Sequence, residues 1–228
     1  VYKYQSEVND VQGLPKHYDK RTWTHVVGVD FGFNDESAWT VLAAHPHEKQ
    51  IYVLRAHKQA RLLVDQTAAM TLDLCEEFQP MTVVGDPGGY GKSHVEEWNA
   101  RYAGMRGKGD YTLPPMVGAD KLKKRSHIEL LNTELRQRRV LLCQTECAPL
   151  STELTALPWY DESRKEEHPA YANHAADSML YAFMNHYAYL NAKPDDQKRV
   201  IHAPDSEARI RQEEDSFLQA ESASWWDR

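Results

Sequence analysis

Three aspartates in the sequence stand at positions where a fold could bring them together. Asp30 ends one apolar run and Asp86 ends another, as expected of two buried strands. Asp177 lies three residues after His174 in the first turn of a predicted helix, and residues three apart share a helix face. If the two strands are neighbours and the helix packs on their sheet, we expect the three carboxylates to meet at one edge of that sheet.

Carboxylates that converge repel one another unless cations neutralise them. Hard oxygen ligands of this kind suit Mg²⁺ or Mn²⁺, and two such ions can activate a water molecule and stabilise the leaving oxygen when a phosphodiester bond is cleaved. The residue types therefore predict a site for two divalent cations, Mg²⁺ or Mn²⁺. Asp30, Asp86 and Asp177 would bind the metals, and His174 would assist as a ligand or proton carrier.

Each aspartate also has a purely structural interpretation. Asp30 could be a turn residue ahead of a glycine, and the sequence Asp-Pro-Gly-Gly at 86–89 is good turn chemistry by itself. Asp177 could interact with the helix dipole, with Asn173 as the N-cap. The joint placement of the three acids, at two strand ends and one helix start, favours the metal site.

The pattern of apolar residues predicts three strands followed by alternating helices and strands. Short connections make the three strands two antiparallel hairpins. The predicted strands are 25–31, 38–43, 51–56, 81–85, 116–118 and 140–142. The predicted helices are 62–78, 92–102, 122–138, 150–157 and 174–189, and 161–168 is expected to be a charged loop. This order predicts a mixed α/β layer with the antiparallel hairpins at one side.

Composition limits the class of protein. The chain has 228 residues and a net charge of −7, with 41% hydrophobic and 27% charged residues, which suits a soluble globular protein. No apolar run approaches the roughly 20 residues of a membrane span, so we expect no membrane association. The three cysteines, Cys75, Cys143 and Cys147, cannot all pair, which favours free thiols in a reducing compartment.

The two ends of the chain differ in character from the middle. Residues 1–24 are polar with scattered aromatics, and we expect a linker from an upstream domain and a lead-in to the first strand. Because the first residue is valine, we expect an excised domain. Residues 191–228 contain six Lys/Arg and nine Asp/Glu, and we expect this tail to be mobile or to bind a partner.

Another class of protein would use the stretch 85–93 to bind phosphate. Its glycines, Lys92 and Ser93 resemble a P-loop, which would make the chain a nucleotide-binding ATPase or kinase. The P-loop motif has four residues between its first glycine and Gly-Lys-Ser, but here there are five, and Asp86 adds a negative charge. A third class is a module without catalytic activity that docks on a larger assembly through its tail.

Three segments together resemble a known family. Val-Gly-Val-Asp-Phe-Gly-Phe-Asn-Asp-Glu-Ser-Ala at 27–38, Val-Val-Gly-Asp-Pro at 83–87 and Asn-His-Ala-Ala-Asp-Ser-Met-Leu-Tyr-Ala at 173–182 are similar to the C-terminal nuclease domain of the large terminase subunit of tailed bacteriophages. The resemblance covers residues 25–190. It implies an RNase H-like fold and metal-dependent, largely sequence-independent cutting of double-stranded DNA during genome packaging.

Carried over residue by residue, the resemblance assigns Asp30, Asp86 and Asp177 to the metal-binding acids and His174 to a histidine often found beside the third acid. Many members of the family have an acid where this chain has Asn173, and alanine where it has Ser178. A fourth carboxylate at position 173 is therefore absent here. Within the same fold, the nearest alternative is a junction resolvase or a transposase-type nuclease.

The resemblance also implies partners. These are double-stranded DNA, an ATPase domain in the same full-length chain, the portal and the small terminase subunit, in the cytoplasm of the host cell. No stretch of the sequence resembles the ATPase domain, and we expect the isolated nuclease domain to be a monomer.

Basic residues that could contact DNA gather in one region of the sequence. Residues 119–140 contain seven basic and three acidic residues, and the glycine-rich loop at 104–109 adds more. Since the whole chain is acidic, we expect weak, salt-sensitive binding through phosphates. The candidate contacts are Lys92, Arg106, Lys121, Lys123, Lys124 and Arg125.

Overall fold

The structure is a computed structural model, which describes residues 1–187 except 33–34, 90, 122–123, 162 and 164–165. The predicted tail at 191–228 and the candidate DNA contact Lys123 lie outside the described residues. In the part of the chain that is described, no helix is both long enough and apolar enough to cross a membrane. The three cysteines are free and buried, as expected.

A mixed sheet of seven described strands forms the centre of the fold, in the order β1-β7-β4-β3-β2-β5-β6. Strands β2, β3 and β4 form two antiparallel hairpins, and the other neighbours pair in parallel. The strands are β1 (Asp10–Val11), β2 (Thr24–Asp30), β3 (Glu36–Ala44), β4 (Ile51–Ala60), β5 (Thr82–Gly85), β6 (Met116–Gly118) and β7 (Val140–Cys143). The predicted fold class, three antiparallel strands followed by alternating helices and strands, is confirmed. The hairpins expected at one side of the sheet lie instead at its centre, between β7 and β5, because parallel strands pair with both of their outer edges.

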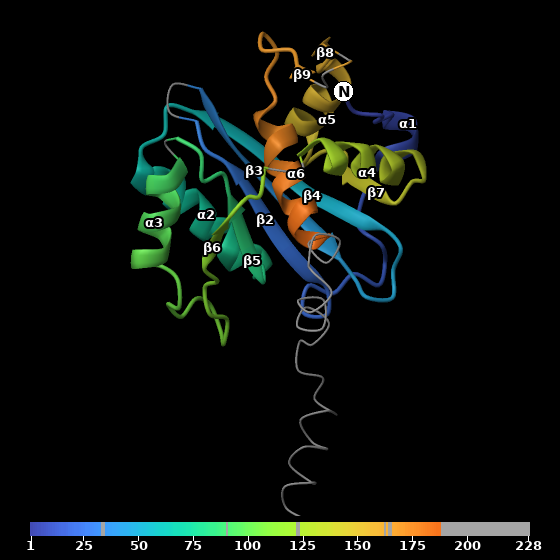
Figure 1. Ribbon diagram of the computed structural model, residues 1–228. Coiled ribbons are helices and arrows are strands. Elements are labelled where there is room, and N and C mark those ends of the chain that lie inside the picture. The colour runs from blue at the N-terminus through green and yellow to red at the C-terminus, as the bar shows by residue number, and fades with distance from the viewer. Residues whose placement is uncertain (33–34, 90, 122–123, 162, 164–165, 188–228) are drawn as a thin grey trace, which may run out of the picture. The chain divides into compact units, whose positions relative to one another are not determined.

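Helices cover both faces of this sheet (Figure 1). They are α1 (Ser6–Asn9), α2 (Val64–Phe78), α3 (Gly91–Arg101), α4 (Lys124–Arg136), α5 (Ala148–Ala156) and α6 (His174–His186). Successive residues of β3 show that α2 and α6 lie on opposite faces, because side chains alternate along a strand. Nε1 of Trp39 donates to Oγ1 of Thr71 in α2, at 2.9 Å, whereas Oγ1 of Thr40 is 2.7 Å from Oγ of Ser178 in α6.

Helix α6 is the most deeply buried helix of the described chain, and it packs directly on the sheet. Every residue from Ala175 to Met184 is buried. The helix approaches β2 so closely at Gly28 that a Cβ atom there would lie 1.9 Å from the carbonyl oxygen of Ser178. Small residues in α6 and the glycine in β2 therefore set the distance between the helix and the strand.

The linker expected at residues 1–24 is wrong for the first part of that range. Strand β1 pairs in parallel with β7. The side chain of Asn9 is 1% exposed and donates hydrogen bonds to the carbonyls of Leu135 and Val140. Tyr2 and Trp23 are also buried. A strand of two residues has no periodicity that the sequence could reveal, so this part of the sheet was missed.

The charged loop expected at 161–168 also contains regular structure. Strand β9 (Glu166–Glu167) pairs antiparallel with β8 (Trp159–Asp161) and forms a separate small sheet, with Trp159 opposite Glu167. The helix predicted over 62–78 begins two residues later, at Val64, because Leu63 is its N-cap and is 64% exposed. The buried residues of α2 are Thr67, Ala68, Thr71, Leu74 and Cys75.

The close approach at Gly28 gives a prediction about stability. In Gly28→Ala, the new methyl group forces α6 away from β2, so we expect the free energy of unfolding to fall by about 1–3 kcal/mol. Urea unfolding followed by circular dichroism measures this change. The control is Gly13→Ala, where no atom lies within 4 Å of the added Cβ. Equal stability of the two variants would contradict the prediction.

Candidate active site

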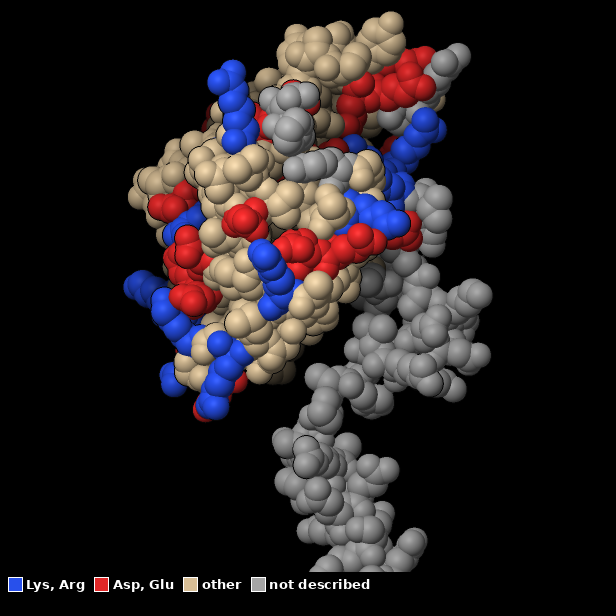
Figure 2. Space-filling view, turned by 90° about the vertical axis from the view of Figure 1, so that its left-hand side faces the viewer, with Lys and Arg blue, Asp and Glu red and all other residues tan. Residues whose placement is uncertain are grey.

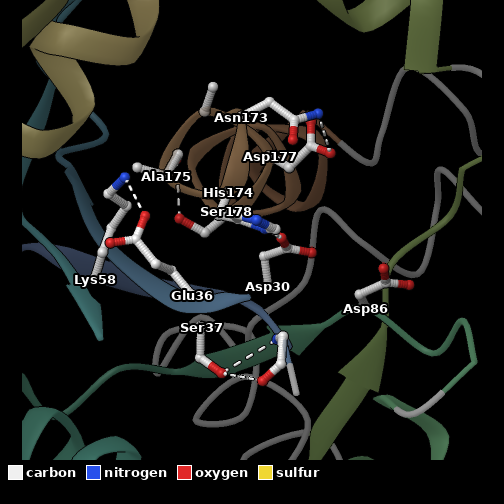
Figure 3. A network of polar contacts seen from close by, with 12 residues as sticks. Asp30, Glu36, Ser37, Lys58, Asp86, Asn173, His174, Ala175, Asp177 and Ser178 are labelled. Carbon is white, nitrogen blue, oxygen red and sulfur yellow. Dashed lines mark hydrogen bonds and ion pairs between the residues drawn. The ribbon is translucent and has the colours of Figure 1, made fainter. Parts of the chain in front are cut away.

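Asp30 and His174 meet where the end of β2 faces the start of α6 (Figure 3). Asp30 is the last residue of β2 and is 8% exposed, and His174 is the first residue of α6. Nδ1 of His174 lies 2.8 Å from Oδ2 of Asp30. This hydrogen bond raises the pKa of His174 above its usual value, although burial acts in the opposite direction. When Nδ1 carries a hydrogen, the imidazole donates it to the Asp30 carboxylate.

Asp86 lies beside Asp30 because their strands are parallel neighbours. Val29 is in register with Gly85, and the backbone N–H of Asp86 donates to the carbonyl of Val29 at 3.1 Å. The backbone therefore leaves β2 and β5 at the same edge of the sheet. Oδ1 of Asp86 accepts a hydrogen bond from the N–H of Gly88 at 2.7 Å, which is the turn interaction expected of an Asp-Pro-Gly sequence. Oδ2 lies 2.5 Å from the ammonium group of Lys121.

Asp177 lies in the first turn of α6 and is 9% exposed. Its Oδ1 is 2.7 Å from Nζ of Lys124, and its Oδ2 is 3.4 Å from Nδ2 of Asn173. Burial raises the pKa of Asp177 to about 7, and the neighbouring Glu167 carboxylate adds to this rise while Lys124 opposes it. A low-dielectric environment disfavours the charged carboxylate, so a nearby cation has a large effect on this residue.

Glu167, in β9, adds a fourth carboxylate that the sequence did not reveal. Its Oε2 accepts hydrogen bonds from Nζ of Lys124 at 3.0 Å and from Nδ2 of Asn173 at 2.9 Å. The side chain thus lies next to Asp177. Its strand has two residues and follows a charged stretch without apolar spacing, so no sequence signal distinguished Glu167 from its neighbours.

Tyr181 shows that the four acids surround a common region. Its ring is buried one turn after Asp177 in α6, and Nζ of Lys121 lies 5.9 Å from the ring centroid. Burial raises the pKa of the Tyr181 hydroxyl, and the carboxylates that raise it further are those of Asp177, Asp30, Asp86 and Glu167. The predicted site residues therefore do gather at one edge of the sheet.

Lysines and a histidine, rather than shared ligands, neutralise these carboxylates in the structure. Asp30 pairs with His174, Asp86 with Lys121, and Asp177 and Glu167 with Lys124. Within the described residues, no three His, Cys, Asp or Glu side chains are arranged to hold a metal ion as they stand. Side-chain movements would be needed to bring them around an ion.

A buried polar network fixes the start of α6. Oε2 of Glu153 accepts a hydrogen bond from the N–H of Ala176 at 2.9 Å, which satisfies one of the donors that a helix start leaves without a partner. Oε1 of Glu153 accepts from Nζ of Lys58, which also contacts Glu36 (Figure 3). The negative charge of Glu153 lies near the positive end of the helix dipole, a favourable placement. This network holds His174 and the rest of the first turn in place.

The candidate DNA contacts fall into two groups. Lys121 and Lys124 pair with Asp86 and Asp177 and belong to the acid cluster itself. Lys92, Arg106 and Arg125 are exposed. Lys92 is 3.7 Å from Glu96, and Arg106 pairs with Asp110. On the face that carries α2 and α3, basic and acidic side chains alternate (Figure 2), in agreement with these pairs. Contact with DNA stays a prediction for all of them.

The pair between His174 and Asp30 gives a prediction for the protein in EDTA. Since folding raises the pKa of His174, the folded state binds this proton more tightly than the unfolded state does. The stabilisation is therefore fully present below the ordinary histidine pKa, and it disappears as the pH rises through the raised value. We expect His174→Gln to lose about 1–2 kcal/mol of stability at pH 6 and much less at pH 9.

Urea unfolding at a series of pH values measures this difference, with the exposed His47→Gln as the control. A stability difference that stays constant from pH 6 to pH 9, or that grows with pH, would be inconsistent with a protonated His174 beside Asp30.

Comparison with known proteins identifies the fold. No family model matches the sequence, and no curated protein matches it significantly. Among solved structures, the chain is similar to the nuclease domain of the P22 large terminase, with 16% identity and a TM-score of 0.61 over 82% of this chain and 92% of that one. It is also similar to the SPP1 large terminase nuclease domain with bound Mn. The identity is 14% and the TM-score is 0.57, over 78% of this chain and 95% of that one.

A longer protein has the same fold in one part. The large terminase of a thermophilic bacteriophage is similar with 15% identity and a TM-score of 0.60, over 80% of this chain. The match covers 44% of that longer terminase, so the present chain spans less than half of its length. The chain thus has the RNase H-like fold of large terminase nuclease domains, as the three sequence segments predicted.

Proposed function

We propose that this chain is the nuclease domain of a phage large terminase subunit and cuts double-stranded DNA with little sequence specificity in a metal-dependent reaction. The observation that carries the proposal is the placement of Asp30, Asp86 and Asp177 at one sheet edge of a fold found in terminase nuclease domains. The Mn bound to the SPP1 nuclease domain supports a divalent cation.

The donor atoms of the site suit two hard cations, Mg²⁺ or Mn²⁺. Carboxylate oxygens predominate, which these ions prefer. Oε1 of Glu167 is buried and accepts no hydrogen bond from any described residue. Oδ1 of Asp177 is also buried, and it lies 2.7 Å from the Lys124 ammonium group. Buried acceptors without donors are costly, and a cation would satisfy them.

Each residue then has a role in phosphodiester cleavage. Asp30 and Asp86, at the two strand ends, and Asp177, in the first turn of α6, would hold the ions. Bound divalent cations supply Lewis acidity for the attacking water and the leaving oxygen. His174 orients Asp30 through their hydrogen bond, and its raised pKa lets it hold a proton that it can give to or take from a reacting oxygen.

Exposed basic residues would contact phosphates, which carry no sequence information. Arg106, Arg125 and Lys92 are candidates, and Lys121 and Lys124 become available if cations displace them from the acids. An ATPase domain in the same full-length chain, the portal and the small terminase subunit are the partners that we propose to hold the DNA. The host cytoplasm is the proposed location.

The other functions have less support. A P-loop lysine turns toward the phosphates at the mouth of its loop, whereas Lys92 lies on the exposed side of α3 and is 3.7 Å from Glu96. Asp86 also places its carboxylate at this loop. These contacts disfavour the ATPase or kinase. No observation specifically favours a junction resolvase or a transposase-type nuclease over the terminase nuclease.

Plasmid cleavage tests the proposal. We expect the chain to nick and linearise supercoiled plasmid with Mg²⁺ or Mn²⁺ and not with EDTA. Asp86→Asn keeps the size of the side chain but removes a ligand charge, so we expect its cleavage rate to fall on the order of 100-fold or more. The control is Asp73→Asn, which changes an exposed acid of α2. Equal rates for Asp86→Asn and Asp73→Asn, or cleavage that persists in EDTA, would refute the proposal.

A further inference from the structure

We propose that Glu167 is a fourth carboxylate ligand of the cation site at Asp177, and that the ammonium group of Lys124 holds this position when the cation is absent. The inference rests on the proposed metal-dependent function and adds a ligand that comes from the β8–β9 hairpin. Neither the sequence pattern nor the three-acid arrangement assigns a metal-binding role to this residue.

The position of the Lys124 ammonium group marks where a cation can be bound. Nζ lies 2.7 Å and 3.0 Å from the two carboxylate oxygens of Asp177, and 3.0 Å from Oε2 of Glu167. Two carboxylates on different elements thus already face one positive charge. Mg²⁺ binds oxygen at about 2.0–2.1 Å, so both side chains need to close by about 1 Å around an ion at this position.

Among the described residues, the charges at this position do not balance. The Asp30 carboxylate has His174 and the Asp86 carboxylate has Lys121, but Asp177 and Glu167 share the charge of Lys124. A divalent cation in place of the ammonium group would match the two carboxylates.

A carboxylate oxygen that accepts no hydrogen bond from any described residue is the second independent observation. Oε1 of Glu167 is fully buried, and no described residue donates a hydrogen bond to it. Oδ1 of Asp177, in a residue that is 9% exposed, is also buried, and its neighbour is the Lys124 ammonium group at 2.7 Å. The other oxygen of Glu167 is held by Asn173 and Lys124. Asn173 also lies within 3.4 Å of Asp177, so one amide orients both carboxylates toward the same place.

Calorimetric titration with Mn²⁺ tests the inference on the whole chain. We expect the unchanged chain to bind two ions, and Glu167→Gln to bind one of them at least about 10-fold more weakly. Glu167→Asp keeps the charge but shortens the side chain by one methylene. A ligand loses its reach in this variant, so we expect Glu167→Asp to bind Mn²⁺ as weakly as Glu167→Gln. The control is Glu166→Gln, the exposed neighbour in β9.

Lys124→Met gives the opposite expectation. If the ammonium group competes with the cation, its removal raises the affinity for Mn²⁺ several-fold. Without metal, the variant has a lower melting temperature than the unchanged chain, and added Mn²⁺ raises this temperature again. Circular dichroism of each variant confirms that it is folded before titration. Weaker binding of Mn²⁺ by Lys124→Met would show that the Lys124 ammonium group does not compete with the cation for this position.

The outcomes separate the inference from the proposed function. If Glu167→Asp binds like the unchanged chain while Glu167→Gln binds weakly, Glu167 acts only through its charge and is no ligand. If both variants bind like Glu166→Gln, the inference fails, but cleavage that depends on Asp86 still supports the nuclease. If the unchanged chain neither binds Mn²⁺ nor cleaves plasmid, the proposed function fails together with the inference.

Discussion

The close packing of α6 against β2 is the constraint on which the site depends. Gly28 leaves no room for a side chain beneath the carbonyl of Ser178, and the hydroxyls of Ser178 and Thr40 meet in the same layer. Glu153 holds the first turn from the other side through the N–H of Ala176. Because the helix is fixed in this way, its first residues stand directly above the strand ends. An acid on a strand and an acid on a helix can then share one region without any loop to position them.

Packing four carboxylates into this region has an electrostatic cost, and basic side chains near the start of α4 offset it. Lys121 and Lys124 each point to an acid of the cluster. Part of the basic charge at 119–140 therefore serves the protein itself and is not simply available to DNA. Under the proposed function, these side chains would change partner when cations bind the acids, and their charge would then become available to a phosphate backbone.

Much of the fold could be predicted from the sequence because its central strands are continuous apolar runs and α6 is a long, mostly apolar segment. The positions of Asp30 and Asp86 followed from strand ends, and Asp177 and His174 followed from helical spacing. The two-residue strands β1 and β9 could not be predicted, since so few residues carry no pattern. Glu167 was missed for the same reason. The pairing of lysines with acids depends on tertiary contacts, which spacing along the chain does not encode.

The ends of the sheet have a consequence for solubility and assembly. Its two outermost strands are also its shortest: β1 has two residues and β6 has three. An edge strand exposes backbone groups that can recruit a strand from another molecule, and short edges limit that recruitment. The long, apolar strands β2, β3 and β4 lie inside the sheet, where both of their sides are paired. Among the described strands, this order therefore works against edge-to-edge aggregation.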